Sequence, residues 1–358
     1  MNTYWNQSII ILLALLTVLT TSCVETLDTD IKVNAPLLVV RASVMDTVVA
    51  EMTEVAPMFV QLKYLNPSSS RFTPDGQEEV LINDASVTIT DTDDNSYPLE
   101  WIGDGRYVNV TPGIQGVGYQ VSIEIPDVGL IESAVEVLPT PNDRVIDTRV
   151  AYEPLTVVTD EGEAFEQNIV NLYFDTELRE GGTENYLMYK SYKVYQFNES
   201  PAFTNFPRNC YVTEGVFSSA ASIHVLDEFN DRQTHLAARS AYDLRFRIGA
   251  HFHIIKHYLN ASAHNFFAQI NLNQDQSSIL FSSLPGEVET NFTLSGEGSS
   301  SVRVEGYFIT AKIDYMRVKA TPVPLGPGIS NPCNNGFMER CRDCLTIPNS
   351  SLERPDYW

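Results

Sequence analysis

The sequence contains no apolar run long enough to cross a membrane as a helix, which takes about 20 residues. Its longest apolar-biased stretch near the N-terminus covers only residues 9–19. That length is typical of the hydrophobic region of a signal peptide, and the small residues before Cys23 fit a cleavage site. Residues 1–22 also lack Asp, Glu, Lys and Arg, so only the α-amino group is charged there. We therefore predict a signal peptide at residues 1–22.

The cysteine that follows these small residues resembles a lipobox, the site at which bacterial lipoproteins are cleaved and lipidated. The resemblance implies lipid, such as diacylglycerol and palmitate, on Cys23. Each buried CH₂ adds about 0.8 kcal/mol to membrane binding, so several chains on one cysteine anchor a protein durably. The alternative is an ordinary secretory signal with Cys23 incidental. Residues 23–35 are polar and acidic, and we interpret them as a flexible tether.

Basic residues are half as frequent as acidic ones, with 23 Lys and Arg against 46 Asp and Glu and a formal net charge of −23. Such a surface repels the phosphates of nucleic acid and of anionic lipid headgroups. We expect no nucleic-acid partner, and membrane attachment through the N-terminal lipid.

The common catalytic motifs are absent from the sequence. It has no GxSxG, SxxK or HExxH motif for hydrolysis, and no GxGxxG or Walker loop for a nucleotide. We expect no enzyme activity and no cofactor. Carboxylates are abundant, so a pair that cleaves a glycosidic bond stays open as an alternative.

Short strand patterns separated by turn residues fill most of the chain. From 36 to 141, alternating stretches such as 58–64 and 119–125 recur between Pro-, Gly- and Asp-rich turns. This spacing indicates a β-sandwich similar to immunoglobulin or fibronectin domains. Residues 142–321 predict a larger β-rich domain, and residues 322–358 form a Pro-, Gly- and Cys-rich tail. We expect an all-β fold with one or two helices.

One helix stands out in the second domain. Ser262 can cap it, and apolar residues follow with helical spacing at Ala263, Phe266, Phe267 and Ile270. We interpret this stripe as core packing rather than as a ligand site.

All six histidines fall in the second domain. On a strand, His251 and His253 share a face because side chains alternate, and His257 could complete a Zn²⁺ or Cu²⁺ site. No Asp or Glu occurs between 244 and 274 to serve as a ligand or base. We therefore expect no bound metal and interpret this segment as a surface strand with scattered imidazoles.

Besides Cys23, the chain has four cysteines, at Cys210, Cys333, Cys341 and Cys344. In an oxidising compartment such as the periplasm or cell surface we expect two disulfides, at least one joining Cys210 to the other three. A Cys341–Cys344 disulfide, a Cys₄ zinc site and a redox-active CxxC are the alternatives. Ordering each tail residue costs on the order of 1–2 kcal/mol, so we expect Trp358 to anchor the tail on the second domain.

Four tyrosines recur at every third residue, at Tyr186, Tyr189, Tyr192 and Tyr195. Because aromatic side chains are favoured at binding surfaces, a binding strip is one interpretation. The other, which we favour, is cross-strand packing of residues with high β propensity.

The C-terminal half carries a series of motifs in a characteristic order. They are NYLMYK at 185–190, NCYVTE at 209–214, HYLNAS at 257–262, FSSLPGEV at 281–288, GYF at 306–308, CRDC at 341–344 and RPDYW at 354–358. With the lipobox and the N-terminal sandwich, this order resembles the Bacteroidota lipoproteins grouped as domain of unknown function 4249. The resemblance covers nearly the whole mature chain. It implies an outer-membrane lipoprotein, often found beside a TonB-dependent transporter of the starch-utilisation type, without established catalytic residues.

From this resemblance we expect a non-enzymatic lipoprotein, lipid-anchored at the outer membrane on the cell surface or the periplasmic face. It would assist a TonB-dependent transporter in ligand capture or uptake. A surface adhesion or scaffold protein and a hydrolase acting on glycans or peptides are the alternatives. The sequence does not name a ligand.

Overall fold

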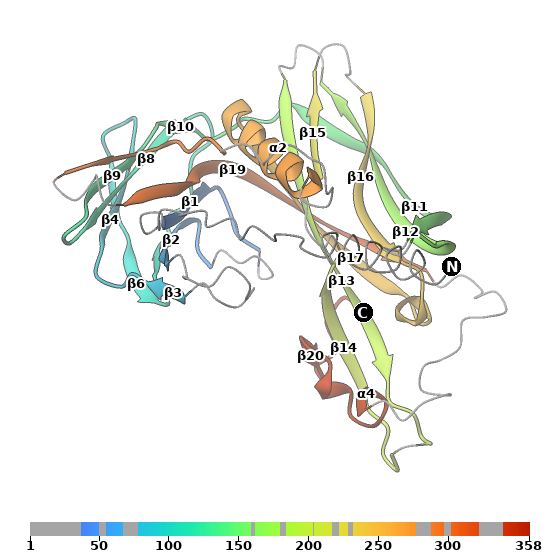
Figure 1. Ribbon diagram of the computed structural model, residues 1–358. Helices are drawn as coiled ribbons and strands as arrows, with labels where there is room; N and C mark the ends of the chain where they lie inside the picture. Colours follow the sequence, from blue (N-terminus) through green and yellow to red (C-terminus); the bar gives the residue numbers. More distant parts are fainter. Residues whose placement is uncertain are drawn as a thin grey trace, which may run out of the picture. The chain divides into compact units, whose positions relative to one another are not determined.

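The computed structural model describes residues 37–49, 55–66, 78–158, 162–179, 184–202, 204–216, 222–227, 232–276, 288–296, 302–321 and 339–358. The expected signal peptide, Cys23, the tether and Cys333 lie outside these residues. Most of the described chain forms three β-sheets (Figure 1), which confirms the all-β expectation. Within the described chain, no helix is long and apolar enough to span a membrane.

The largest sheet has eleven strands and draws on both predicted domains. Its strands are β1 (Leu37–Met45), β2 (Met58–Asn66), β3 (Glu78–Leu81), β6 (Glu100–Gly103), β7 (Arg106–Asn109), β13 (Asn185–Asn198), β14 (Asn209–Gly215), β15 (Ser222–Leu226), β17 (Ala250–Leu259), β19 (Arg303–Ala320) and β20 (Ser350–Ser351). The main order is β20-β14-β13-β17-β19-β1-β2-β7-β6, with β15 beside β13 and β3 beside β2.

Two smaller sheets and short helices complete the described structure. One sheet contains β4 (Ser86–Asp91), β5 (Ser96–Pro98), β8 (Gly118–Ile125), β9 (Gly129–Ser133), β10 (Glu136–Val137) and β18 (Phe292–Ser295). The other contains β11 (Asp143–Val158), β12 (Ala164–Leu178) and β16 (Arg232–Ala241). The helices are α2 (Ala261–Gln276), α4 (Glu339–Arg342) and the 3₁₀ turns η1 (Leu244–Phe246) and η2 (Cys344–Thr346).

The first hydrophobic core lies between the six-stranded sheet and the β1–β2–β7 part of the large sheet. Alternate residues of β4 and β1 point inward, among them Val87 and Leu38. Phe292 on β18 and Phe308 on β19 belong to the same core. Residues assigned from sequence to the second domain therefore complete the sandwich, and strand pairing crosses the boundary expected at residue 141.

Strand β19 runs through both halves of the large sheet (Figure 1). Its first half pairs in parallel with β1, and its second half pairs antiparallel with β17. Gly306 lies opposite Val40 with φ of +124°, and a Cβ at this position would lie 1.8 Å from the Val40 carbonyl oxygen. Glycine is required here because it alone tolerates both the positive φ and the close approach.

Strand β17 is buried along its whole length. Residues such as Ile254 face β12 and β16 in the second core, whereas residues such as Ile255 face a third cluster that includes α2. The expectation that this histidine-rich segment is a surface strand is therefore wrong. It is a central strand covered on both faces.

Helix α2 is capped by Asn260 rather than by Ser262. The amide of Ala263 donates to the side-chain oxygen of Asn260 at 2.8 Å, which satisfies one of the free N–H groups at the start of the helix. Ala263 is fully buried and Phe267 packs on the same cluster. These contacts confirm the interpretation of the stripe as core packing.

Candidate functional site

A C-terminal segment, residues 339–358, is cross-linked to the β13–β14 hairpin; we call it the C-terminal clasp. Cys210 on β14 is disulfide-bonded to Cys344, with Cα atoms 6.0 Å apart. Cys341 is also disulfide-bonded. The prediction that Cys210 pairs with the tail cysteines is confirmed. The alternative of a Cys341–Cys344 disulfide is wrong, because Cys344 is bonded to Cys210. The same bond excludes a Cys₄ zinc site and a redox-active CxxC, since both need Cys344 as a free thiolate.

A buried carboxylate, Glu199, holds the clasp at a second point. Its side chain is 1% exposed and accepts hydrogen bonds from Arg208 Nη2 at 2.7 Å and from the Cys344 amide at 3.0 Å. Arg208 also pairs with Asp343 of the clasp at 2.7 Å. Burial acts to raise the pKa of Glu199, but the hydrogen bonds from Arg208 and Cys344 outweigh it and the net pKa is lowered.

The end of the clasp packs on the large sheet through aromatic side chains. The Trp358 ring lies 5.2 Å from that of Tyr211 and 5.0 Å from that of His251, between centroids. The neighbouring Tyr357 ring lies 4.9 Å from that of His253. Trp358 is thus the anchor on the second domain that the sequence predicts.

The three histidines considered as metal ligands all lie buried on one face of β17. His253 stacks on Tyr192 with centroids 4.5 Å apart, and its Nδ1 bonds to the hydroxyl of Tyr315. Burial lowers the pKa of His251 and lowers that of His253 to about 4. Together with His257, they form no cluster of three or more metal-binding side chains, and none occurs elsewhere among the described residues.

The period-three tyrosines do not form one continuous strip on β13. Residues three apart on a strand point to opposite faces, so Tyr189 and Tyr195 join the second core while Tyr186 and Tyr192 join the third cluster. All four contribute to packing. Tyr195 also lines the cavity described next.

A cavity of about 530 Å³ lies between the β13–β14 hairpin, the turn at η1 and the clasp. Its lining combines apolar and aromatic side chains with charged ones, namely Tyr195, Phe197, Val212, Ile347 and Pro348 with Glu214, Asp243, Arg245 and Arg340. Strand register places Tyr195 opposite Val212 and Lys193 opposite Glu214. The volume lies within the range of small-molecule sites, about 300–1,000 Å³.

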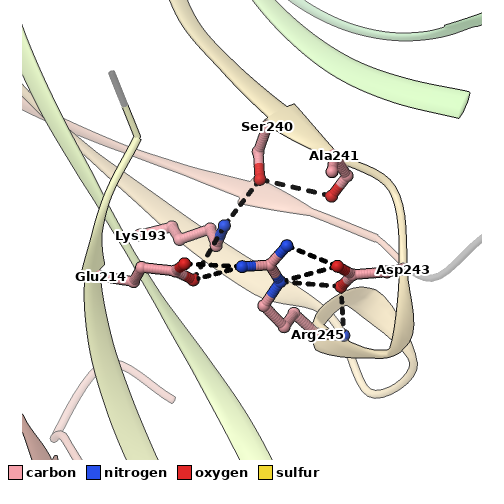
Figure 2. Close-up of polar contacts among 6 residues, drawn as sticks. All are labelled: Lys193, Glu214, Ser240, Ala241, Asp243 and Arg245. Atoms are coloured by element: carbon pink, nitrogen blue, oxygen red, sulfur yellow. Dashed lines mark hydrogen bonds and ion pairs between the residues drawn. The ribbon is translucent and has the colours of Figure 1, made fainter. Parts of the chain in front are cut away.

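Arg245 joins both carboxylates of the cavity, as Figure 2 shows. Its Nη1 donates to the two carboxylate oxygens of Glu214 at 2.6 and 2.8 Å, and its Nε donates to those of Asp243 at 2.8 and 2.9 Å. Burial acts to lower the pKa of Arg245, but the pairing with Asp243 and Glu214 outweighs it and the net pKa is raised. The guanidinium therefore fixes the positions of both acids.

Lys193 supports this network from inside the core. Its side chain is 3% exposed, and its Nζ lies 3.1 Å from Glu214 and donates to Ser240 Oγ at 2.6 Å (Figure 2). Burial and the charge of Arg245 lower the pKa of Lys193, while Glu214 partly opposes them. A buried ammonium is tolerated only with such partners, so Lys193 fixes the inner side of Glu214.

The sequence analysis did not single out Glu214, Asp243 or Arg245. Asp243 and Arg245 lie about thirty residues beyond Glu214 in the chain, and no local motif connects them. The only sequence feature that could have pointed to this site was the pair Lys193 and Glu214. Opposite charges that face each other on paired strands attract, so a hairpin that pairs these strands would bring the two together.

A comparison with family models identifies the family of this chain. The model described as Domain of unknown function (DUF4249) matches residues 24–315. The chain belongs to the DUF4249 family. The DUF4249 match includes Lys193, Glu214, Asp243 and Arg245 and ends before the clasp. A comparison with curated proteins finds no match.

Proposed function

We propose that the protein is a non-enzymatic Bacteroidota lipoprotein, lipid-anchored at the outer membrane, that captures a small ligand for a TonB-dependent transporter. The observation that supports ligand capture is the cavity between the β13–β14 hairpin and the clasp. It combines a suitable volume with apolar walls and a few fixed polar groups, the usual composition of a ligand site.

The arrangement of the charges favours binding over catalysis. Lys193, Glu214, Asp243 and Arg245 are all engaged in ion pairs with one another. A glycosidase needs two carboxyl groups that flank the bond and act separately, but here both carboxylates are held by the same guanidinium. The network presents fixed donors and acceptors, which suits recognition.

The lipid anchor is proposed from the sequence. The lipobox-like segment ends at Cys23, and the DUF4249 match begins at residue 24. In cells that process lipoproteins, Cys23→Ser should release the protein from membranes or leave it unprocessed, whereas Val24→Ala should behave as the wild type. Membrane fractionation checks this, and a Cys23→Ser protein that is processed and stays with the membrane contradicts lipid anchoring.

The transporter partnership is tested by affinity purification of the full chain from detergent-solubilised membranes. A TonB-dependent transporter recovered in near-stoichiometric amount by mass spectrometry supports the proposal. Its absence, when the protein is intact and membrane-bound, contradicts the partnership.

An adhesion or scaffold role is a second candidate because apolar side chains are exposed on the first sandwich. Trp101 and Ile102 on β6 are 53% and 45% exposed, and Leu81 on β3 is 37% exposed. The Trp101 indole donates to Asn83, two residues beyond Leu81, so Trp101 lies near the end of β3 that carries Leu81. Exposed apolar groups that gather together mark protein contacts, and a Trp101→Ala/Leu81→Ala variant that loses every copurifying protein would favour this role.

A further inference from the structure

We propose that the cavity beside the clasp binds a neutral polyhydroxylated ligand of the carbohydrate class. The inference rests on the proposed capture function and specifies the chemistry of what is captured. It follows from the balanced charges of the Lys193–Glu214–Asp243–Arg245 network, the hydrogen-bonding groups exposed there and the aromatic side chains beside them on β13.

The charged network is balanced within itself. Two cations, Lys193 and Arg245, are paired with two carboxylates, Glu214 and Asp243, at 2.6–3.1 Å in the hydrogen bonds and ion pairs described above. An anionic ligand that takes Arg245 must displace one of these carboxylates. A cationic ligand must displace a lysine or arginine, and either exchange leaves a partly buried charge without its partner, which is costly.

A hydroxyl-bearing ligand avoids this exchange. The side chains of Glu214, Asp243 and Arg245 remain 38%, 40% and 27% exposed. A carboxylate has about four lone-pair sites, so it can accept from a ligand while it keeps its arginine, and a hydroxyl group both donates and accepts. Hydroxyl groups can therefore add to the existing network without breaking an ion pair.

The apolar side chains beside the charged network suit the C–H face of a sugar ring. Phe197 and Tyr195 lie on the same face of β13, and the clasp contributes Ile347 and Pro348. Aromatic faces carry partial negative charge and attract polarised C–H groups. A pyranose ring offers C–H groups on its faces and hydroxyls around its rim, which matches an apolar wall beside a polar one.

The test uses the full chain purified in detergent, screened on an array of neutral glycans and then titrated by calorimetry with the di- or trisaccharide that binds. We expect saturable one-to-one binding of a neutral saccharide. Arg245→Lys and Phe197→Ala should each weaken binding by tenfold or more. Arg149→Lys and Phe165→Ala, which change the same residue types at partly exposed positions outside the cavity, should leave it unchanged.

Because Arg245→Lys removes ion pairs and can disturb folding, Arg340→Gln at the exposed edge of the cavity provides a second variant. It should weaken the same saccharide with a smaller change in melting temperature than Arg245→Lys causes. Binding of charged peptides or acidic sugars with no neutral glycan bound would overturn the inference, as would a neutral glycan whose affinity none of the three cavity variants changes. Copurification of a transporter in the same preparation tests capture separately, so failure of the ligand class is distinguishable from failure of the proposed function.

Discussion

Removing the bond between Cys210 and Cys344 should lower the free energy of unfolding by several kcal/mol. The bond joins residues 134 positions apart. In the chain-entropy model, closing a loop of this length removes unfolded-state entropy worth about 5 kcal/mol at 25 °C. Compact unfolded chains retain some structure, so about 5 kcal/mol is an upper value for the Cys210→Ala/Cys344→Ala variant.

Urea unfolding under non-reducing conditions measures this change, with tryptophan fluorescence as the signal. Trp358 reports on the clasp because it packs against Tyr211 and His251. Val212→Ala is the matched control: it deletes buried volume on the same strand without removing a cross-link, and should cost about 2 kcal/mol.

The clasp should also detach first in the double variant. The contacts of Glu199 and Trp358 then hold it on the β13–β14 hairpin without the Cys210–Cys344 bond, so hydrogen exchange at residues 339–358 should rise before the sandwich core is affected. If the double variant unfolds at the same urea concentration as the wild type and Val212→Ala is destabilised as expected, the entropic account of the bond is refuted.

Three further predictions concern particular side chains. Gly306→Ala should destabilise the protein by about 3 kcal/mol or more, because the added Cβ would collide with the Val40 carbonyl oxygen. Thermal melting measures the loss, with Gly103→Ala as the control, because φ is also positive at Gly103 but no atom lies within 4 Å of the added Cβ. Because the pKa of Glu199 is lowered on folding, the stability that Glu199 contributes is complete above the ordinary pKa of 4.5 and is lost as the pH falls through the lower folded pKa. Hydrogen exchange of the clasp should rise over this acid range, and a Glu199→Gln protein with the same acid profile would contradict the assignment. Lys193→Met should change the free energy of unfolding by less than about 1 kcal/mol, because it removes one buried charge while Glu214 keeps its ion pair with Arg245. Denaturant unfolding measures the change, and a loss above about 3 kcal/mol would contradict this reasoning and show that the network depends on Lys193.

Much of the strand content followed from the sequence because alternation is a local signal. The stretches at 58–64 and 119–125 became β2 and β8, and one helix appeared where the apolar spacing placed it. The cap was assigned to Ser262 instead of Asn260 because both residue types can cap a helix. Which of the two residues caps the helix depends on where β17 ends, and the local sequence does not specify that end.

The histidine strand shows where local reasoning ends. The spacing of His251 and His253 correctly placed them on one face, but it could not reveal that β17 is central and covered on both sides. Burial of a strand depends on which other strands pair with it. Here β13 and β19 flank it, and every residue of β17 pairs with one that is at least 54 positions away in the chain, since the smallest separation is that of Tyr258 and Lys312.

The sequence by itself predicted the β class, the Trp358 anchor and the DUF4249 resemblance, because each depends on residue type or local period. The pairing of Cys210 with the tail was one of several alternatives, and the tertiary structure decided it. The tertiary structure alone decided that β19 joins two cores and that Glu214, Asp243 and Arg245 meet Lys193. The charged residues are far apart in the chain and share no motif. They converge because strand register sets Lys193 opposite Glu214, and because the chain leaving β16 turns at η1 to bring Arg245 between the two acids.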